Sequence, residues 1–322
     1  MSNATAVLND VYRVMESPVF TEKVVLTPRP DLIPGIPDYF VALFSPIVAY
    51  WVYASIFHVV DVYELAEKYR IHPSEEEERR NKVTLREVVK DVLLQHFIQT
   101  FVGVVVYFFE PPKTTGHELE LMWQLRHQLP SSVPSWAIYY GYYYAWPVIK
   151  FLLGITVIDT WQYMWHRLMH ENKALYRRFH SRHHRLYVPY AYGALYNDPF
   201  EGFLLDTLGA GVAQFLVQLT PRECIFLFCF STLKTVDDHS GYRLPNDPFQ
   251  MLFPNNTVYH DIHHQQWGIK NNFSQPFFVF WDKLFNTDYK FIDEYKHQQN
   301  QITLAKYKEF LAKKDRSKKK TE

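Results

Sequence analysis

The sequence of 322 residues has only two cysteines and eleven glycines, and its formal net charge is zero. Cys224 and Cys229 lie in an apolar stretch without a CxxC spacing, so neither a disulfide framework nor a zinc ribbon is expected. A net charge of zero provides no overall field that would recruit nucleic acid, and no nucleic-acid partner is expected. Aromatic residues make up 17% of the chain, which together with the shortage of glycine favours packed helices and membrane interfaces over turn-rich β structure.

Residues 1–16 lack the continuous apolar core of a cleavable signal peptide, so we expect internal segments to insert into a membrane. A helix needs about 20 predominantly apolar residues to cross the hydrocarbon core. Three segments are predicted spans on this basis, namely 39–59, 92–109 and 138–165. Two further apolar pieces, 203–219 and 222–236, are separated at Thr220-Pro221, where proline should break the helix, and we expect them to form a hairpin or two shallow spans.

The distribution of lysine and arginine predicts the orientation of these spans. The connection between the first two spans includes Lys68, Arg70, Arg79, Arg80, Lys82 and Arg86, whereas the next connection holds only Lys113 and Arg126. Because basic loops stay on the cytosolic side, we expect the first connection, everything after residue 237 and the C-terminus to be cytosolic. The last residues, Lys319-Lys320-Thr321-Glu322, resemble a dilysine address for the endoplasmic reticulum, which predicts a multi-pass protein of that membrane.

Histidine is concentrated in one part of the chain. Nine of the 15 histidines lie between positions 166 and 264, grouped as His166 and His170; His180, His183 and His184; His239 alone; and His260, His263 and His264. Spacings of i, i+3 and i+4 lie on one side of a helix, so we expect each group to aim at one point. Crowded imidazoles repel one another when protonated and need partners when neutral, and a bound cation resolves both problems.

Nine donors exceed the four or so that one zinc ion takes, and they suit two metal ions with open coordination positions. Spacing alone does not identify the metal, because imidazole accepts zinc, copper, iron and nickel. The remaining histidines are isolated, and we interpret them as ordinary surface or core residues: His58, His72, His96, His117, His127 and His297.

Charged side chains near the histidines are candidates for supporting roles. Carboxylates could accept a hydrogen bond from the outer nitrogen of a metal-bound imidazole, with helix caps and salt bridges as the alternative: Asp159, Asp198, Asp238 and Asp261, together with Glu201 and Asp237. Basic residues could dock an acidic electron donor, or could bind lipid headgroups or fix the orientation: Arg167, Lys173, Arg177, Arg178, Arg182 and Arg185.

The order of these histidine motifs between apolar hairpins resembles the fatty acid hydroxylase and sterol desaturase superfamily of integral-membrane di-iron enzymes. Further stretches are similar to the fungal sphinganine C4-hydroxylases, and they lie at 48–51, 65–75, 187–193, 235–242 and 253–266. The resemblance implies an all-α integral-membrane helical bundle with a cytosolic, histidine-rich di-metal cap. We expect an N-terminal segment at 1–36, a transmembrane region at 37–150, a hydroxylase domain at 151–290 and a cytosolic tail at 291–322.

The same resemblance implies a reaction and its cofactors. The nine grouped histidines correspond to the family's metal ligands, which hold two iron ions, although zinc could occupy them in a purified sample. Sphinganine, free or within dihydroceramide, would be hydroxylated at C4 with O2 to the phytosphingosine type. The sequence has no His-Pro-Gly-Gly haem motif. Electrons would therefore come from NADH through a separate cytochrome b5, and membrane lipid would surround the protein.

Three other functions are consistent with the residues. A desaturase of the same superfamily would use the same oxidant to remove a second hydrogen. A metal transporter or non-catalytic metal-binding protein would also use histidine, although its ligands are expected inside the spans rather than beyond them. A membrane zinc hydrolase is disfavoured by the surplus of histidines and by the absence of an obvious carboxylate ligand within the clusters.

Overall fold

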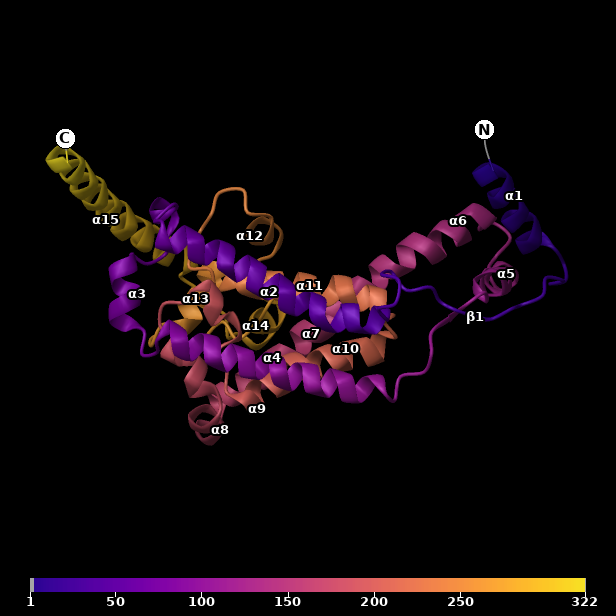
Figure 1. Ribbon diagram of the computed structural model, residues 1–322, viewed down its shortest axis with the longest axis horizontal. Helices are drawn as coiled ribbons and strands as arrows, with labels where there is room; N and C mark the ends of the chain where they lie inside the picture. Colours follow the sequence, from indigo (N-terminus) through magenta and orange to yellow (C-terminus); the bar gives the residue numbers. More distant parts are fainter. Residues whose placement is uncertain (1–2, 322) are drawn as a thin grey trace.

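The computed structural model describes residues 3–321, and the side chains of residues 5–313. The molecule is elongated, with a bundle of long helices in the middle, a small lobe around the N-terminus at one end and a cap of short helices at the other (Figure 1). Helices dominate the described residues, and the β structure consists of one two-stranded ribbon. The expectation of an all-α membrane protein is confirmed in this sense.

Four helical segments are long and apolar enough to cross a membrane. They are α2 (Asp38–Val62), α4 (Leu85–Tyr107), the continuous run of α6 (Ser135–Tyr140), η2 (Gly141–Ala145) and α7 (Trp146–Glu171), and the run of α9 (Pro199–Gly202), η5 (Phe203–Leu208) and α10 (Gly209–Val217). All three expected spans and the first piece of the hairpin are among them. The second piece forms α11 (Pro221–Asp238), which packs against α2 and α7 but carries charged residues at both ends and is not a candidate span.

The chain break between α10 and α11 has a local cause. α10 ends at Gln218, whose φ of 55° is left-handed, and α11 begins with Pro221 in its first turn. Thr220 and Glu223 form a capping box, in which each side chain binds the backbone N–H of the other residue. The predicted break at Thr220-Pro221 is therefore confirmed. Thr84 and Glu87 form a second capping box at the start of α4.

The lobe around the N-terminus consists of α1 (Asn3–Glu16), α5 (Glu118–Gln128) and the start of α6. Met15, Met122 and Ile138 form its buried core. Strand β1 (Thr27–Pro28) pairs antiparallel with β2 (Thr114–Thr115), which ties the N-terminal segment to the connection between α4 and α6. Both therefore lie at the same end of the bundle, as the predicted arrangement of spans requires.

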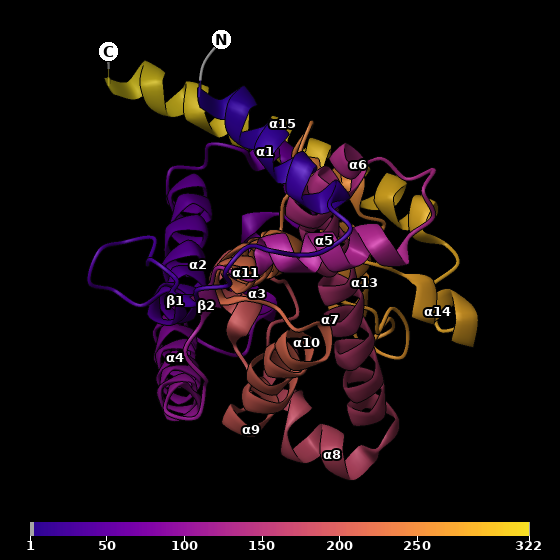
Figure 2. The same cartoon turned by 90° about the vertical axis from the view of Figure 1, so that its right-hand side faces the viewer.

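The cap lies at the opposite end of the bundle and is built from short elements of distant parts of the sequence (Figure 1). Figure 2 looks along the bundle from the end of the N-terminal lobe. The elements of the cap are η1 (Glu67–Tyr69), α3 (Ser74–Arg80), α8 (Lys173–Arg178), η3 (His180–Arg185), η4 (Ala191–Leu195), α12 (Pro248–Leu252), α13 (Thr257–His264), α14 (Phe280–Phe285) and the first part of α15 (Ile292–Thr321). A buried cluster that includes Tyr50, Val92 and Tyr196 joins the cap to α2 and α4. The expected dilysine address at 319–322 lies outside the described side chains.

Candidate metal centre

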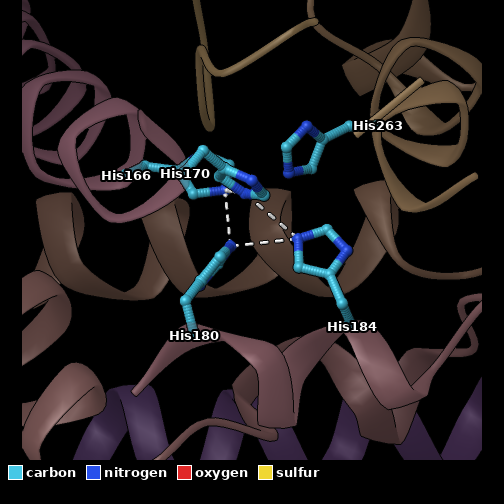
Figure 3. A group of neighbouring side chains, drawn as sticks. All are labelled: His166, His170, His180, His184 and His263. Carbon is cyan, nitrogen blue, oxygen red and sulfur yellow. Dashed lines mark hydrogen bonds between the residues drawn. The ribbon is translucent and has the colours of Figure 1, made fainter. Parts of the chain in front are cut away.

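Nine buried or half-buried imidazoles converge inside the cap in two groups. The first group contains His166, His170, His180, His184 and His263, and the second contains His183, His239, His260 and His264. Within each group, one nitrogen of every ring lies within 4.8 Å of one nitrogen of every other ring. Figure 3 shows the five rings of the first group pointing toward one another from three elements, α7, η3 and α13. These are the nine histidines that the sequence motifs single out.

Histidines of one sequence motif are divided between the two groups, which corrects the expectation that each motif aims at one point. His180 and His184 belong to the first group, whereas His183 between them belongs to the second. In α13 the arrangement is reversed, because His260 and His264 join the second group and His263 joins the first. On this helix residues i and i+4 are about 40° apart, whereas His263 and His264 are about 100° apart and face different centres.

Backbone carbonyls hold the outer nitrogens of most rings. Nδ1 of five of the nine donates to a carbonyl oxygen at 2.7–3.0 Å: His166 to Phe273, His183 to Tyr196, His239 to Thr235, His263 to Asn271 and His264 to Leu186. A carbonyl only accepts hydrogen bonds, so Nδ1 carries the proton of the neutral ring. The inward-facing Nε2 then presents a lone pair, which is the form of histidine that binds a metal.

The inward nitrogens lie at the separations expected of ligands that share one cation. Nε2 of His184 lies 3.0 Å from Nε2 of His180 and 3.1 Å from Nε2 of His170. In the second group, Nε2 of His260 lies 3.0 Å from Nε2 of both His239 and His264. Two lone pairs at this separation repel each other, whereas two ligands bound at about 2.1 Å to one ion lie this close. The donor set therefore fits two metal ions.

Burial keeps these rings in the form that can bind a metal. Burial lowers the pKa of His183 to about 4 and that of His239 to about 3. Burial, followed by the neighbouring imidazoles, also lowers the pKa values of His184 and His264 well below the ordinary value. The rings are neutral at physiological pH, so metal ions do not have to displace protons from them.

One of the nine rings has a carboxylate as its outer partner. Nδ1 of His180 lies 2.5 Å from Oε1 of Glu201, and both side chains are buried. Glu201 lies on α9, whose first turn is capped by the side chain of Asp198. Such a carboxylate fixes the orientation of the imidazole and raises its basicity toward a metal.

Four of the five other acidic residues singled out from the sequence bind different groups, and the carboxylate oxygens of the fifth, Asp237, are buried without a hydrogen-bond partner among the described residues. Asp159 accepts from the backbone N–H groups of Phe277 and Phe278, and Asp198 accepts from that of Phe200. Asp238 pairs with the fully buried Lys234, and Asp261 binds His72 and Tyr295. These hydrogen bonds position the elements that carry the imidazoles, rather than the imidazoles themselves.

Comparison with known proteins supports the site. The fatty acid hydroxylase family matches residues 151–287, which include all nine histidines. Sphingolipid C4-hydroxylase SUR2 of Saccharomyces cerevisiae is 58% identical over 91% of this chain and 84% of its own. The chain belongs to the fatty acid hydroxylase family.

Two further relatives show the range of names within the family. Sphingolipid C4-hydroxylase sur2 of Schizosaccharomyces pombe is 46% identical over 77% of this chain and 87% of its own. Very-long-chain aldehyde decarbonylase GL1-9 of Oryza sativa is 44% identical over 78% of this chain and 89% of its own. No solved structure matches the chain.

The six basic residues of this fatty acid hydroxylase differ in exposure. Arg167 and Arg182 are half-buried and pair with Glu171 and Asp91. Arg185 donates to the carbonyl oxygen of Lys82. The side chains of Lys173, Arg177 and Arg178 are exposed, although Arg178 also lies 3.4 Å from Asp198. All three exposed residues lie on α8, beside the first histidine group in the sequence.

Sequence reasoning missed the role of His72. Although His72 is isolated in the sequence, it is 3% exposed, and its Nε2 lies 3.0 Å from Oδ1 of Asp261 in α13. Its Nδ1 lies 3.1 Å from Oε2 of Glu76 in α3. His72 therefore links α3 to α13, the helix that carries three of the nine imidazoles. No pattern in the sequence signals this contact, because the two residues are 189 positions apart.

An apolar cavity of about 280 Å³ lies among the membrane-spanning helices. Its walls come from α2, α4, α7, η5, α10 and α11, and include Leu43, Val102, Ile158 and Phe228. Thr235 lines the cavity, and its carbonyl oxygen accepts from Nδ1 of His239 at 2.8 Å. Thr235 therefore separates the cavity from His239 of the second histidine group, and the cavity extends from there into the apolar bundle.

Proposed function

We propose that this protein is a sphinganine C4-monooxygenase, which hydroxylates the long-chain base, free or within dihydroceramide, to the phytosphingosine type. The observation that carries the proposal is the name of the two yeast relatives, which are 58% and 46% identical over most of the chain and are sphingolipid C4-hydroxylases. In the structure, the convergence of nine imidazoles near an apolar cavity also supports the proposal.

The nine histidines would hold two iron ions, and zinc could replace iron in a purified sample. Bound iron would supply the activation of O2 that hydroxylation of an unactivated methylene requires. The chain's own contribution is to hold the ligands neutral and oriented, since carbonyl oxygens fix five Nδ1 atoms and Glu201 fixes a sixth. Burial of the rings excludes water, which would compete in the reaction.

The cavity would position the substrate. Its apolar walls suit an alkyl chain, and a lipid can reach it from the membrane without crossing water. Holding the chain along the cavity would present one methylene group to the histidine groups, and such restriction of a flexible substrate accounts for much of the selectivity of an oxygenase.

Electrons would come from a separate cytochrome b5 that is reduced at the expense of NADH. The exposed basic residues of α8, Lys173, Arg177 and Arg178, suit an acidic partner, and Arg167, Arg182 and Arg185 would contribute to the same field. We assign the protein to the membrane of the endoplasmic reticulum, with the histidine cap and the C-terminus in the cytosol. In this assignment residues 37–150 anchor the protein, residues 151–290 form the hydroxylase domain and residues 291–322 form the tail.

The deciding experiment uses membranes that contain the protein, with sphinganine, ¹⁸O₂, NADH, cytochrome b5 and its reductase. Mass spectrometry of the long-chain bases should detect ¹⁸O at C4, and omission of cytochrome b5 should lower the yield. An unsaturated base would instead favour a desaturase. Parallel reactions with a long-chain aldehyde test the activity named for the rice relative. Absence of any product would favour a metal-binding protein without oxygen chemistry.

A further inference from the structure

A carboxylate lies inside the membrane bundle, on the wall of the apolar cavity. Asp206 belongs to η5, within the candidate span Pro199–Val217. Its Oδ2 accepts from Nε2 of Gln95 at 2.6 Å, and its Oδ1 accepts from Nε2 of Gln162 at 3.2 Å. Gln95 comes from α4 and Gln162 from α7, and both line the same cavity. Three separate spans therefore bring polar groups to one point of an otherwise apolar wall.

The helix that carries Asp206 is shaped for this arrangement. Residues Phe203–Leu208 form a π-helical segment, a geometry that is frequent at functional sites. One turn earlier, a Cβ at Gly202 would lie 2.3 Å from Oε1 of Gln95, so a larger residue would displace that side chain. Gly202 thus lets α4 approach closely enough for Gln95 to reach Asp206.

The three residues lie at the end of the cavity that is near the histidines. Oε1 of Gln95 accepts from Nδ2 of Asn197 at 3.4 Å, and the preceding residue, Tyr196, accepts from Nδ1 of His183 through its carbonyl oxygen at 3.0 Å. Glu201, the partner of His180, precedes Asp206 by five positions. The cavity continues in the other direction to Tyr39 and Val106, at the end of the bundle remote from the cap.

The protein itself provides no cation for Asp206. Among the ion pairs of the described residues, none involves this side chain, and its two partners are neutral amides. By contrast, Lys150, another charged residue of a membrane span, pairs with Glu223 at 2.6 Å. Charged residues within spans are costly and commonly mark the site where a ligand or ion is bound.

We propose that Asp206, with Gln95 and Gln162, forms the anchor that recognises the amino-alcohol head of the long-chain base and makes the free base the preferred substrate. This inference rests on the proposed function and specifies its substrate. The protonated amine of a free base would pair with the carboxylate, while the amide side chains would bind the adjacent hydroxyl groups. The alkyl tail would then extend along the apolar cavity, and the carbons next to the head would lie beside the histidine groups. An N-acylated base has no charge to offer and would lose this ion pair.

A binding experiment tests the anchor without requiring turnover. The full-length protein in detergent is given tritiated sphinganine, which is displaced by octadecylamine or by octadecanol. The two competitors have the same chain and differ in charge, so octadecylamine should displace the label at a concentration at least about tenfold lower, as expected for a charge-assisted contact. Equal potency of the two competitors on the wild-type protein would overturn the proposal, whether or not the protein has hydroxylase activity.

Substitution of the carboxylate gives the second test. Asp206→Asn keeps the shape of the side chain and removes its charge, and Asp293→Asn on the exposed face of α15 serves as the matched control. The Asp206 variant should lose the preference for octadecylamine, and its KM for sphinganine should rise about tenfold with a smaller change for dihydroceramide. An unchanged KM in a folded variant would refute the anchor, and if the variant does not fold, the competition on the wild-type protein decides. A wild-type protein that binds the amine selectively but forms no C4 product would refute the proposed function and leave the anchor intact.

Discussion

Oε1 of Glu201 lies 2.5 Å from Nδ1 of His180, and both side chains are buried inside the cap. Oε2 of the same carboxylate is buried without a hydrogen-bond partner among the described residues. The carboxylate therefore contacts one imidazole, which belongs to the group of five histidines. A carboxyl group in this position holds the ring in place and leaves Nε2 of His180 as the nitrogen that faces a cation.

Glu201→Gln should weaken the first histidine group without removing any of its ligands. The amide keeps an acceptor oxygen but loses the charge, so we expect metal affinity or turnover to fall about 10- to 100-fold. Metal content by mass spectrometry and turnover measured side by side would detect this loss. The control is Glu309→Gln, because Glu309 lies on the exposed surface of α15. Equal metal content and turnover in both variants would contradict a role for Glu201 at the metal.

His183→Ala should abolish turnover while leaving membrane insertion intact. His183 belongs to the second histidine group, so its loss should remove the metal of that group and reduce the bound metal from two ions to one. Metal content and the yield of hydroxylated base are the measurements. His297→Ala is the control, because His297 is exposed on α15. Retained activity in the His183 variant would remove this residue from the ligand set.

Removal of metal should destabilise the cap. Without a cation the inward lone pairs of each group lie about 3 Å apart and repel one another, so a chelator should lower Tm as well as abolish activity. Fe²⁺ should restore both properties, whereas Zn²⁺ should restore Tm alone because zinc does not undergo redox change. Thermal unfolding and turnover after each addition would test this, and full turnover with zinc would contradict an iron-dependent reaction.

The sequence was sufficient to predict the long helices and the histidines that converge in the cap. Apolar length predicts α2 and α4, and proline predicts the break before α11, because these signals are local. The nine histidines are equally visible as motifs. Their division into two groups is not, because His183 and His263 join partners from other elements, and this depends on how distant segments pack.

The supporting contacts were harder to predict for the same reason. Most outer nitrogens bind backbone carbonyls, which every residue possesses, so the identity of Phe273 or Asn271 carries no signal. Nearby carboxylates such as Asp159 and Asp198 have the right chemistry but serve to cap helices or loops. Proximity in sequence thus identifies the histidines that converge better than it identifies the residues that orient them.

The contact between His72 and Asp261 should make stability depend on pH. Burial alone would lower the pKa of His72, but Asp261 and Glu76 raise it to about 9, above the ordinary value of 6.5. The protonated ring therefore stabilises the fold fully below about pH 6.5, and this contribution is lost as the pH rises through 9. The link that His72 makes between α3 and α13 should therefore weaken as the pH rises from about 6.5 to 9.

We therefore expect the Tm of the wild-type protein to exceed that of His72→Gln at pH 6.5 and the difference to shrink toward pH 9.5, by roughly 2–4 °C for each kcal/mol lost. Thermal unfolding of both proteins across this range provides the measurement, and His297→Ala again serves as the control. Glutamine keeps a neutral hydrogen-bonding side chain at position 72, so a converging pair of curves reports the charge of the imidazole rather than its volume. Curves that stay parallel from pH 6.5 to 9.5 would show that His72 is neutral in the folded protein, and its contact with Asp261 would then be an uncharged hydrogen bond.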